Sequence, residues 1–240
     1  MPYLYNEILP NPNTITTPGG FPGVAGSAGQ PFKKVDLVFN SNMEVSRSIY
    51  GRTNLKRTMY PTWEVSLTYN PMTKEQFYPV HNFLMQSGGF RPFSVILPQY
   101  ASPKDSLFAM YNHSNIFVGG SAGSTIITLV SSVWSSNDYS TTGLPSVGDM
   151  FNVNDLNDSQ HSKAYIITGV DTYTDYREFR PTSGTIALHI SPGLQKTPNV
   201  NSTVTFNNPT IRVQLSSDVI EYSLNNNDLY EFGLKLKEVL

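Results

Sequence analysis

Residues 52–98 decide the fold of this chain: RTNLKRTMYPTWEVSLTYNPMTKEQFYPVHNFLMQSGGFRPFSVILP. Apolar and polar residues alternate over residues 63–69, which is the pattern of a strand with one buried and one exposed face. The same alternation resumes over residues 93–97. The stretch therefore predicts two strands of one sheet, with the residues between them forming a helix that packs on it.

Start and stop signals define that helix. Thr73 and Gln76 have the spacing of a capping box, and Gly88 follows the last apolar residue of the helical face. Pro79 conflicts with the pattern, because proline lacks the N–H donor and collides with the preceding turn at a cost of about 3 kcal/mol. The helix is therefore predicted either to kink at Pro79 or to begin nearer Tyr78, with the proline in its first turn.

The composition is that of a folded chain. It has 240 residues, of which 39% are hydrophobic, and 16 basic against 18 acidic residues give a net charge of -2. Such a balance attracts neither nucleic acid nor an anionic membrane over the whole molecule. The chain has no cysteine, no long apolar run and no basic start followed by an apolar segment. We therefore expect no disulfide, no membrane span and no secretory signal, and synthesis in the cytoplasm.

The chain divides into three predicted parts. Residues 1–32, rich in Pro, Gly and Asn, form an extended N-terminal arm; residues 33–104 with 210–240 form a sheet-and-helix domain; residues 105–209 form an inserted domain. The insertion has six short apolar segments separated by turn residues and no helical pattern. The predicted fold class is mainly β (α+β), an antiparallel sheet domain with one packed helix plus an inserted small antiparallel β-barrel or sandwich.

The strand partners in the first domain follow from alternation and proximity. Residues 35–39 alternate like a strand and are predicted to form a hairpin with an extended segment at residues 45–55. Residues 211–215, 220–224 and 230–236 are predicted to return to the same sheet. The last of these is half-buried, since its charged residues share one face.

No group of residues has the spacing of a catalytic or metal site. The Gly-rich run at residues 119–123 lacks the Lys-Ser or Lys-Thr of a phosphate loop, and no nucleophile elbow occurs. The four histidines lie in different predicted elements, and the aspartates near turns fit no calcium loop. The histidines and aspartates considered are His81, His113, His161, His189, Asp155, Asp158, Asp171 and Asp175. We therefore predict no enzyme and no cofactor.

Candidate assembly residues lie near the N-terminus. Phe21 and Phe32 are isolated aromatics of the arm; they would anchor it on a neighbouring subunit, or the arm is an unanchored terminus. Arg52 and Arg57 belong to a basic segment without interleaved aromatics. That composition favours a solvated or subunit-contacting face over a platform for single-stranded nucleic acid.

The ordered motifs give the chain a family resemblance. An arginine-bearing segment, RTNLKR, precedes a Trp-led strand, TWEVSLTY, and then a helix with a Gly- and aromatic-rich strand, FYPVHNFLMQSGGFRPFSVILP. The insertion carries VGDMFNV, KAYIITGV and ISPGL, and the chain ends on RVQLSSDVIEYSL and YEFGLKLKEVL. With these motifs the chain resembles the distal tail or tail-tip adaptor proteins of tailed bacteriophages. Its Pro- and Gly-rich N-terminal arm departs from their usual short start.

The resemblance implies a structural virion protein. It would form a homohexameric ring at the distal end of a tail tube and connect the tube to the baseplate hub or tail-tip protein, after assembly in the host cytoplasm. It implies no specific nucleic-acid binding and no membrane partner. The alternative is a carbohydrate-binding or host-attachment module of a tail, with aromatic side chains in barrel loops stacking on sugars: Trp134, Tyr139, Tyr173 and Tyr176.

Overall fold

A computed structural model describes residues 8–14, 31–41, 43–57, 60–88, 91–131, 134, 143–155, 161–171, 184–217 and 221–239. The chain forms two compact units, one made of Met1–Val95 with Arg212–Val239 and the other mainly of Ile96–Ile211. The insertion was predicted at residues 105–209. The second unit begins earlier because the segment before Asp105 bonds within it: the Lys104 N–H donates to Asp149 at 3.1 Å, and the Ala101 carbonyl accepts from the Asn208 N–H at 2.8 Å.

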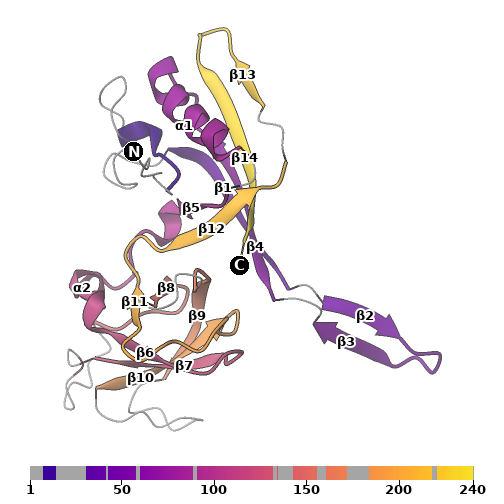
Figure 1. Cartoon of the computed structure of the whole chain (residues 1–240), viewed down its shortest axis with the longest axis vertical. Helices are drawn as coiled ribbons and strands as arrows, with labels where there is room; N and C mark the ends of the chain where they lie inside the picture. Colours follow the sequence, from indigo (N-terminus) through magenta and orange to yellow (C-terminus); the bar gives the residue numbers. More distant parts are fainter. Residues whose placement is uncertain are drawn as a thin grey trace. The chain divides into compact units, whose positions relative to one another are not determined.

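The first unit is built on an antiparallel sheet (Figure 1). Its strand order is β1-β4-β14-β12-β5, and β13 pairs separately with β14. Three of its described strands, β12, β13 and β14, come from residues 210–238. β14 lies between β4 and β12 although it follows both in the sequence. The strands are β1 (Phe32–Asn40), β4 (Thr62–Tyr69), β5 (Phe93–Ile96), β12 (Thr210–Leu215), β13 (Tyr222–Leu224) and β14 (Tyr230–Glu238).

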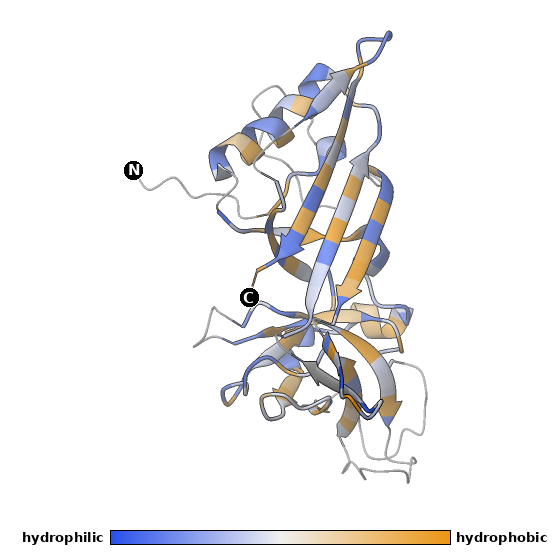
Figure 2. Ribbon diagram, turned by 90° about the vertical axis from the view of Figure 1, so that its right-hand side faces the viewer, coloured by the Kyte–Doolittle hydropathy of each residue, from blue (hydrophilic) through white to orange (hydrophobic). Residues whose placement is uncertain are grey.

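The predicted alternation is confirmed in the two central strands. Trp63, Val65, Leu67 and Tyr69 of β4 are buried and the residues between them are not. In β14 the buried residues alternate with exposed ones from Glu231 onward. Figure 2 shows this alternation of hydrophobic and hydrophilic colour along the long strands. One face of the sheet is therefore core, and the other is solvated.

Helix α1 (Lys74–Ser87) begins at the predicted capping box. The Gln76 side chain accepts a hydrogen bond from the Thr73 N–H at 3.0 Å, and Gly88 ends the helix with φ +59°. The later start near Tyr78 is wrong, because the helix runs through Pro79. The proline leaves the carbonyl of Glu75 without its helical donor; Glu75 is exposed, so water can replace that bond.

The hairpin predicted between residues 35–39 and 45–55 is wrong. Strand β1 pairs instead with β4, with Leu37 opposite Val65. The second segment folds back on itself, since β2 (Met43–Arg47) pairs with β3 (Thr53–Arg57) as a separate two-stranded ribbon. Gly51, with φ +78°, permits the tight turn that divides the segment in two.

The second unit is a closed antiparallel barrel in the order β10-β7-β6-β11-β8-β9. The six predicted apolar segments supply its strands, and its core gathers buried side chains from all of them, including Leu129, Phe151, Tyr165 and Leu188. The predicted fold class is thus confirmed, with the barrel rather than the sandwich. The strands are β6 (Phe117–Gly119), β7 (Ile126–Val130), β8 (Met150–Asn154), β9 (Ala164–Asp171), β10 (Thr185–Ser191) and β11 (Thr203–Thr205).

The absence of a helical pattern in the insertion is a wrong prediction, because α2 (Ser106–Met110) lies within it. Asp105 caps this helix, its carboxylate accepting from the Phe108 N–H at 2.8 Å and from the Gly143 N–H at 3.1 Å. These backbone donors hold the pKa of Asp105 below its usual value. The helix buries Phe108. With only five residues it is too short to give a periodic pattern in the sequence.

Candidate assembly interface

The turn between β2 and β3 is a compact three-residue loop. The Gly51 N–H donates to the Ser48 carbonyl and the Ser48 N–H donates to the Arg52 carbonyl, both at 2.9 Å. The Ser48 hydroxyl also accepts from the Arg52 N–H at 3.2 Å. The backbone and the left-handed Gly51 account for the turn, so the two residues at its tip, Ile49 and Tyr50, are free to be of any type.

The tip nevertheless carries two large apolar side chains. Ile49 is fully exposed and Tyr50 is 94% exposed. Val45, on the adjoining strand, is 59% exposed. A two-stranded hairpin is marginally stable alone, and adjacent exposed apolar side chains at its tip are the kind of surface that a partner covers. The hairpin therefore has the composition of a docking element.

The hairpin is also basic. Arg47 and Arg52 are exposed on either side of the turn, and of the residues in β2 and β3 only Glu44 is acidic. Arginines beside an apolar tip suit an interface whose partner is acidic, because charge complementarity sets both orientation and association rate.

The predicted assembly residues have different positions. Arg52 lies at the hairpin turn and is exposed. Arg57 ends β3, where only its backbone is described. Phe32 begins β1, and its ring packs on Tyr69 of the same chain at 4.9 Å between centroids. Phe21 lies outside the described residues. Arg52 and Arg57 belong to the same hairpin but lie at opposite ends of β3, so the structure does not gather the predicted residues at one point.

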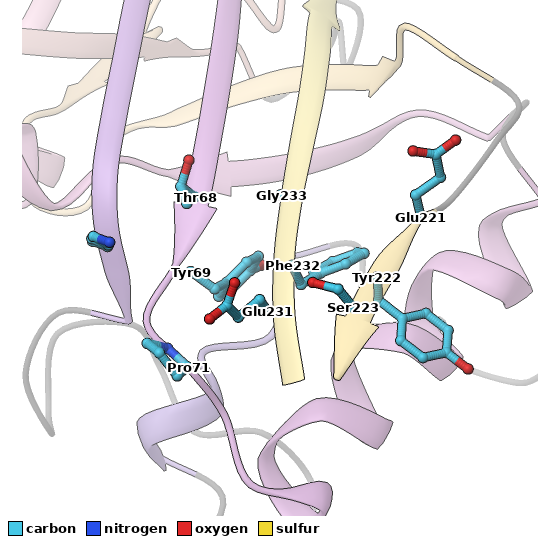
Figure 3. Close-up of a pocket in the computed structure, with 10 residues that line it drawn as sticks. Thr68, Tyr69, Pro71, Glu221, Tyr222, Ser223, Glu231, Phe232 and Gly233 are labelled. Carbon is cyan, nitrogen blue, oxygen red and sulfur yellow. The ribbon is translucent and has the colours of Figure 1, made fainter. Parts of the chain in front are cut away.

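A groove of about 310 Å³ opens on the sheet of the first unit. It lies on the solvated face, where Thr68 and Gly233 are paired and Ser223 is paired with Glu231 (Figure 3). Of the described lining residues only Lys33 is basic, whereas Glu221 and Glu231 contribute two carboxylates. The lining residues are Lys33, Thr68, Tyr69, Pro71, Glu221, Tyr222, Ser223, Glu231, Phe232 and Gly233.

Gly233 forms the floor of the groove. It interrupts the exposed row of β14, in which every second residue otherwise carries a long charged side chain. Figure 3 places it on β14 between Thr68 of β4 and Glu221, the residue before β13. A glycine inside a strand weakens the strand and often marks close approach by another molecule. Here its missing side chain leaves the groove open.

Aromatic rings on the core side support this part of the sheet. Tyr69 stacks on Phe232 at 5.6 Å, and Phe77 of α1 stacks on Tyr230 at 4.4 Å. Burial raises the pKa of Tyr69, so its phenol stays neutral across the physiological range. The groove is thus backed by packed rings of α1, β4 and β14.

The histidines have structural surroundings. His81 packs on the Phe77 ring, His113 bonds the Phe108 carbonyl at 3.0 Å, and His161 bonds the Tyr165 hydroxyl at 3.0 Å. His189 lies 2.7 Å from Asp171 across β9 and β10. Burial lowers the pKa of His113. Within the described ranges, no three His, Asp or Glu side chains gather as metal ligands.

The aromatic residues proposed for sugar stacking fall into two groups. Trp134 is half-buried against the barrel core, and its Nε1–H donates to the Gly143 carbonyl at 3.3 Å. Its ring is committed to packing rather than open for a ligand. Tyr139, Tyr173 and Tyr176 lie outside the described residues.

Comparison with known proteins leaves the resemblance as an interpretation. No protein-family model matches the chain, and no curated protein matches it in sequence. In the described part of the chain no helix is long and apolar enough to cross a membrane.

Sequence reasoning missed the tip and the groove. The tip had a signal, because Ile49 and Tyr50 occupy turn positions that usually hold Asn, Asp or Pro. Gly233 had one as well, since it breaks an alternation of charged residues. The groove itself had none, because Glu221 and Thr68 are far apart in the sequence and meet only through strand pairing.

Proposed function

We propose that this protein is a structural protein of a phage tail, forming a homo-oligomeric ring that connects the tail tube to the baseplate or tail tip. The observation that carries the proposal is the apolar tip of the β2–β3 hairpin, Ile49 and Tyr50, exposed at a turn that does not need them. Sequence resemblance supplies the virion, the six subunits, the tail tube partner and the baseplate hub or tip partner.

Several features support an assembly role. The hairpin offers apolar and basic side chains, and the groove offers carboxylates on the same unit. A molecule with two different complementary surfaces can associate head to tail, and this association closes into a ring when the rotation between subunits permits it. The described histidines contact neighbouring side chains or backbone of their own chain, which is compatible with a structural protein.

Sedimentation velocity of the full-length protein at micromolar concentration tests the proposal. We expect a closed oligomer, and co-sedimentation with the tail tube protein when that protein is added. The variant with Ile49→Asn and Tyr50→Asn should sediment as a monomer and keep the circular dichroism spectrum of the parent. A parent that stays monomeric, alone and with tube protein, would overturn the proposal.

A matched control separates the tip from exposed apolar surface in general. Val200 is also an exposed apolar residue at a turn, but it lies in the barrel unit. Val200→Asn should leave the oligomer intact. If it dissociates the oligomer as completely as the tip variant does, the hairpin is not the assembly element.

A further inference from the structure

We infer that the groove floored by Gly233 receives the β2–β3 hairpin tip of a neighbouring copy of this chain. The inference rests on the proposed ring and names the two surfaces that meet in it. The apolar tip side chains would enter the groove, and Arg47 and Arg52 would face its carboxylates.

The first support is that the groove is shaped to receive a side chain. Gly233 provides a floor without a side chain, and exposed Pro71 provides an apolar wall, whereas the Tyr222 ring packs on Phe77 of α1 on the other side of the sheet. A volume of about 310 Å³ accommodates an aromatic side chain. Tyrosine suits such a site, because it brings a large apolar ring and a polar end at low entropic cost.

Charge complementarity is the second support. Glu221 and Glu231 outnumber Lys33 among the charged lining residues, so the groove is net acidic. The turn of the hairpin is flanked by Arg47 and Arg52. Arginine forms bidentate pairs with carboxylates, which fixes the register between two surfaces in addition to attracting them.

The third support is that tip and groove lie at opposite ends of the same strands. The hairpin is inserted between Asn40 and Thr62, which pair at one end of β1 and β4, whereas Thr68 pairs with Lys34 near the other end. Positions 62 and 68 are six residues apart, which is about 20 Å along a strand. The exposure of Ile49 and Tyr50 shows that the tip is not inserted in a groove of its own chain.

The positions of the tip and the groove allow two types of contact. Two antiparallel copies can exchange tips in a two-fold dimer, or each copy can give a tip and receive one in a repeated head-to-tail contact. The proposed ring requires the second type. In both, the occupant of the groove is a second copy of this chain.

Cysteine cross-linking tests the contact directly, because the chain has no cysteine of its own. The variant with Tyr50→Cys and Ser223→Cys is oxidised at a concentration where the parent assembles. We expect a ladder of covalent oligomers up to ring size on a non-reducing gel, since a disulfide needs the two Cα atoms within about 7 Å. The control combines Tyr50→Cys with Lys237→Cys, on the same face of β14 but opposite Glu64, and should give no ladder.

A second pair of variants tests the floor. In Gly233→Val the added Cβ meets as its nearest neighbour the Leu67 carbonyl oxygen at 3.4 Å, so the subunit tolerates it while the groove fills. We expect the concentration for half-assembly to rise at least about tenfold, as for a central interface position. Lys235→Val, the next exposed residue of β14, should leave it nearly unchanged.

The outcomes separate this inference from the proposed function. If the protein forms an oligomer, but the variant with Tyr50→Cys and Ser223→Cys gives no ladder and Gly233→Val leaves the half-assembly concentration unchanged, the groove contact is overturned and the proposed ring is not. A disulfide confined to the monomer also overturns it, because the tip then fills its own groove. A parent that never assembles overturns the proposed function itself.

Discussion

Two hairpin turns in the first unit have the same backbone hydrogen bonds, but the tip of one carries apolar side chains and the tip of the other carries polar ones. In the β2–β3 turn Gly51 donates to Ser48 and Ser48 to Arg52; in the β13–β14 turn Asp228 donates to Asn225 and Asn225 to Leu229. The last residue of each three-residue loop has a left-handed backbone, with φ +78° at Gly51 and +56° at Asp228. The backbone therefore cannot explain why one tip reads Ile-Tyr and the other Asn-Asn.

The polar turn bonds to itself. The Asn225 side-chain oxygen accepts from the N–H groups of Asn227 and Leu229, at 2.9 and 3.0 Å. Its chemistry is complete within the subunit. The apolar turn has only the hydroxyl of Ser48 in that role, and its tip side chains face solvent. Residues that the fold does not need, at a turn that tolerates polar ones, are best explained by a partner.

The largest expected effect on stability sets the scale for residues that the fold does need. Trp63→Ala removes a ring that is 5% exposed and packs on Phe39 at 4.9 Å. We expect a loss of about 3 to 5 kcal/mol in the free energy of unfolding, measured by urea denaturation of the dilute protein. A loss under about 1 kcal/mol would place the ring outside the core.

The second-largest loss of unfolding free energy is expected from a substitution in the polar turn. Asn225→Ala removes the acceptor of two backbone N–H groups, so we expect a loss of about 1 to 2 kcal/mol in the same measurement. Asn225→Asp keeps an acceptor oxygen and should lose less than half as much. Equal losses in the two variants would show that the side-chain oxygen does not stabilise this turn.

Gly51 tests the backbone that the two turns share. Gly51→Ala places a Cβ at φ +78°, although no atom lies within 4 Å of the added group. We expect a loss of about 1 kcal/mol from backbone conformation alone. Gly51→Asn should lose less, since asparagine tolerates this conformation. Thermal unfolding of the two variants side by side distinguishes this from a general sensitivity of the position.

The smallest effect is expected where the sequence is most unusual. Converting the apolar tip to the polar one, with Ile49→Asn and Tyr50→Asn, should change the unfolding free energy of the monomer by less than about 0.5 kcal/mol. Measurement below the assembly concentration is essential, because association adds to apparent stability. A loss above about 1.5 kcal/mol would show that the tip packs within its own chain, and the contrast between the turns would no longer point to a partner.

Local patterns predicted the elements of this fold well. The alternation in β4 and β14 and the capping box at Thr73 each depend on residues close together in sequence, where short-range sterics and hydrogen bonding act. The barrel strands followed from short apolar runs between turns. Pro79 misled only because the exposed Glu75 carbonyl lets the helix accept it.

Pairing was harder to predict, because the partner of a strand is set by contacts distant in sequence. β1 has the same alternation whether it joins β2 or β4, and only the glycine turn at Gly51 could have argued for the second. The candidate site shared this difficulty. Arg52 was singled out from charge, but Glu221 and Thr68 line one groove through the pairing of β4, β14 and β13.

The central place of the last strand has a consequence for synthesis on the ribosome. The barrel segment, Ile96–Ile211, is translated before β14, so the strands of the barrel are all made before the strand that completes the sheet. The sheet cannot be completed before β14 is made, because β14 is the strand that lies between β4 and β12. A nascent chain that stops before Tyr230 presents an unpaired edge of β4, an aggregation hazard for the cell. The sheet that carries the groove is therefore completed only after β14 has been made.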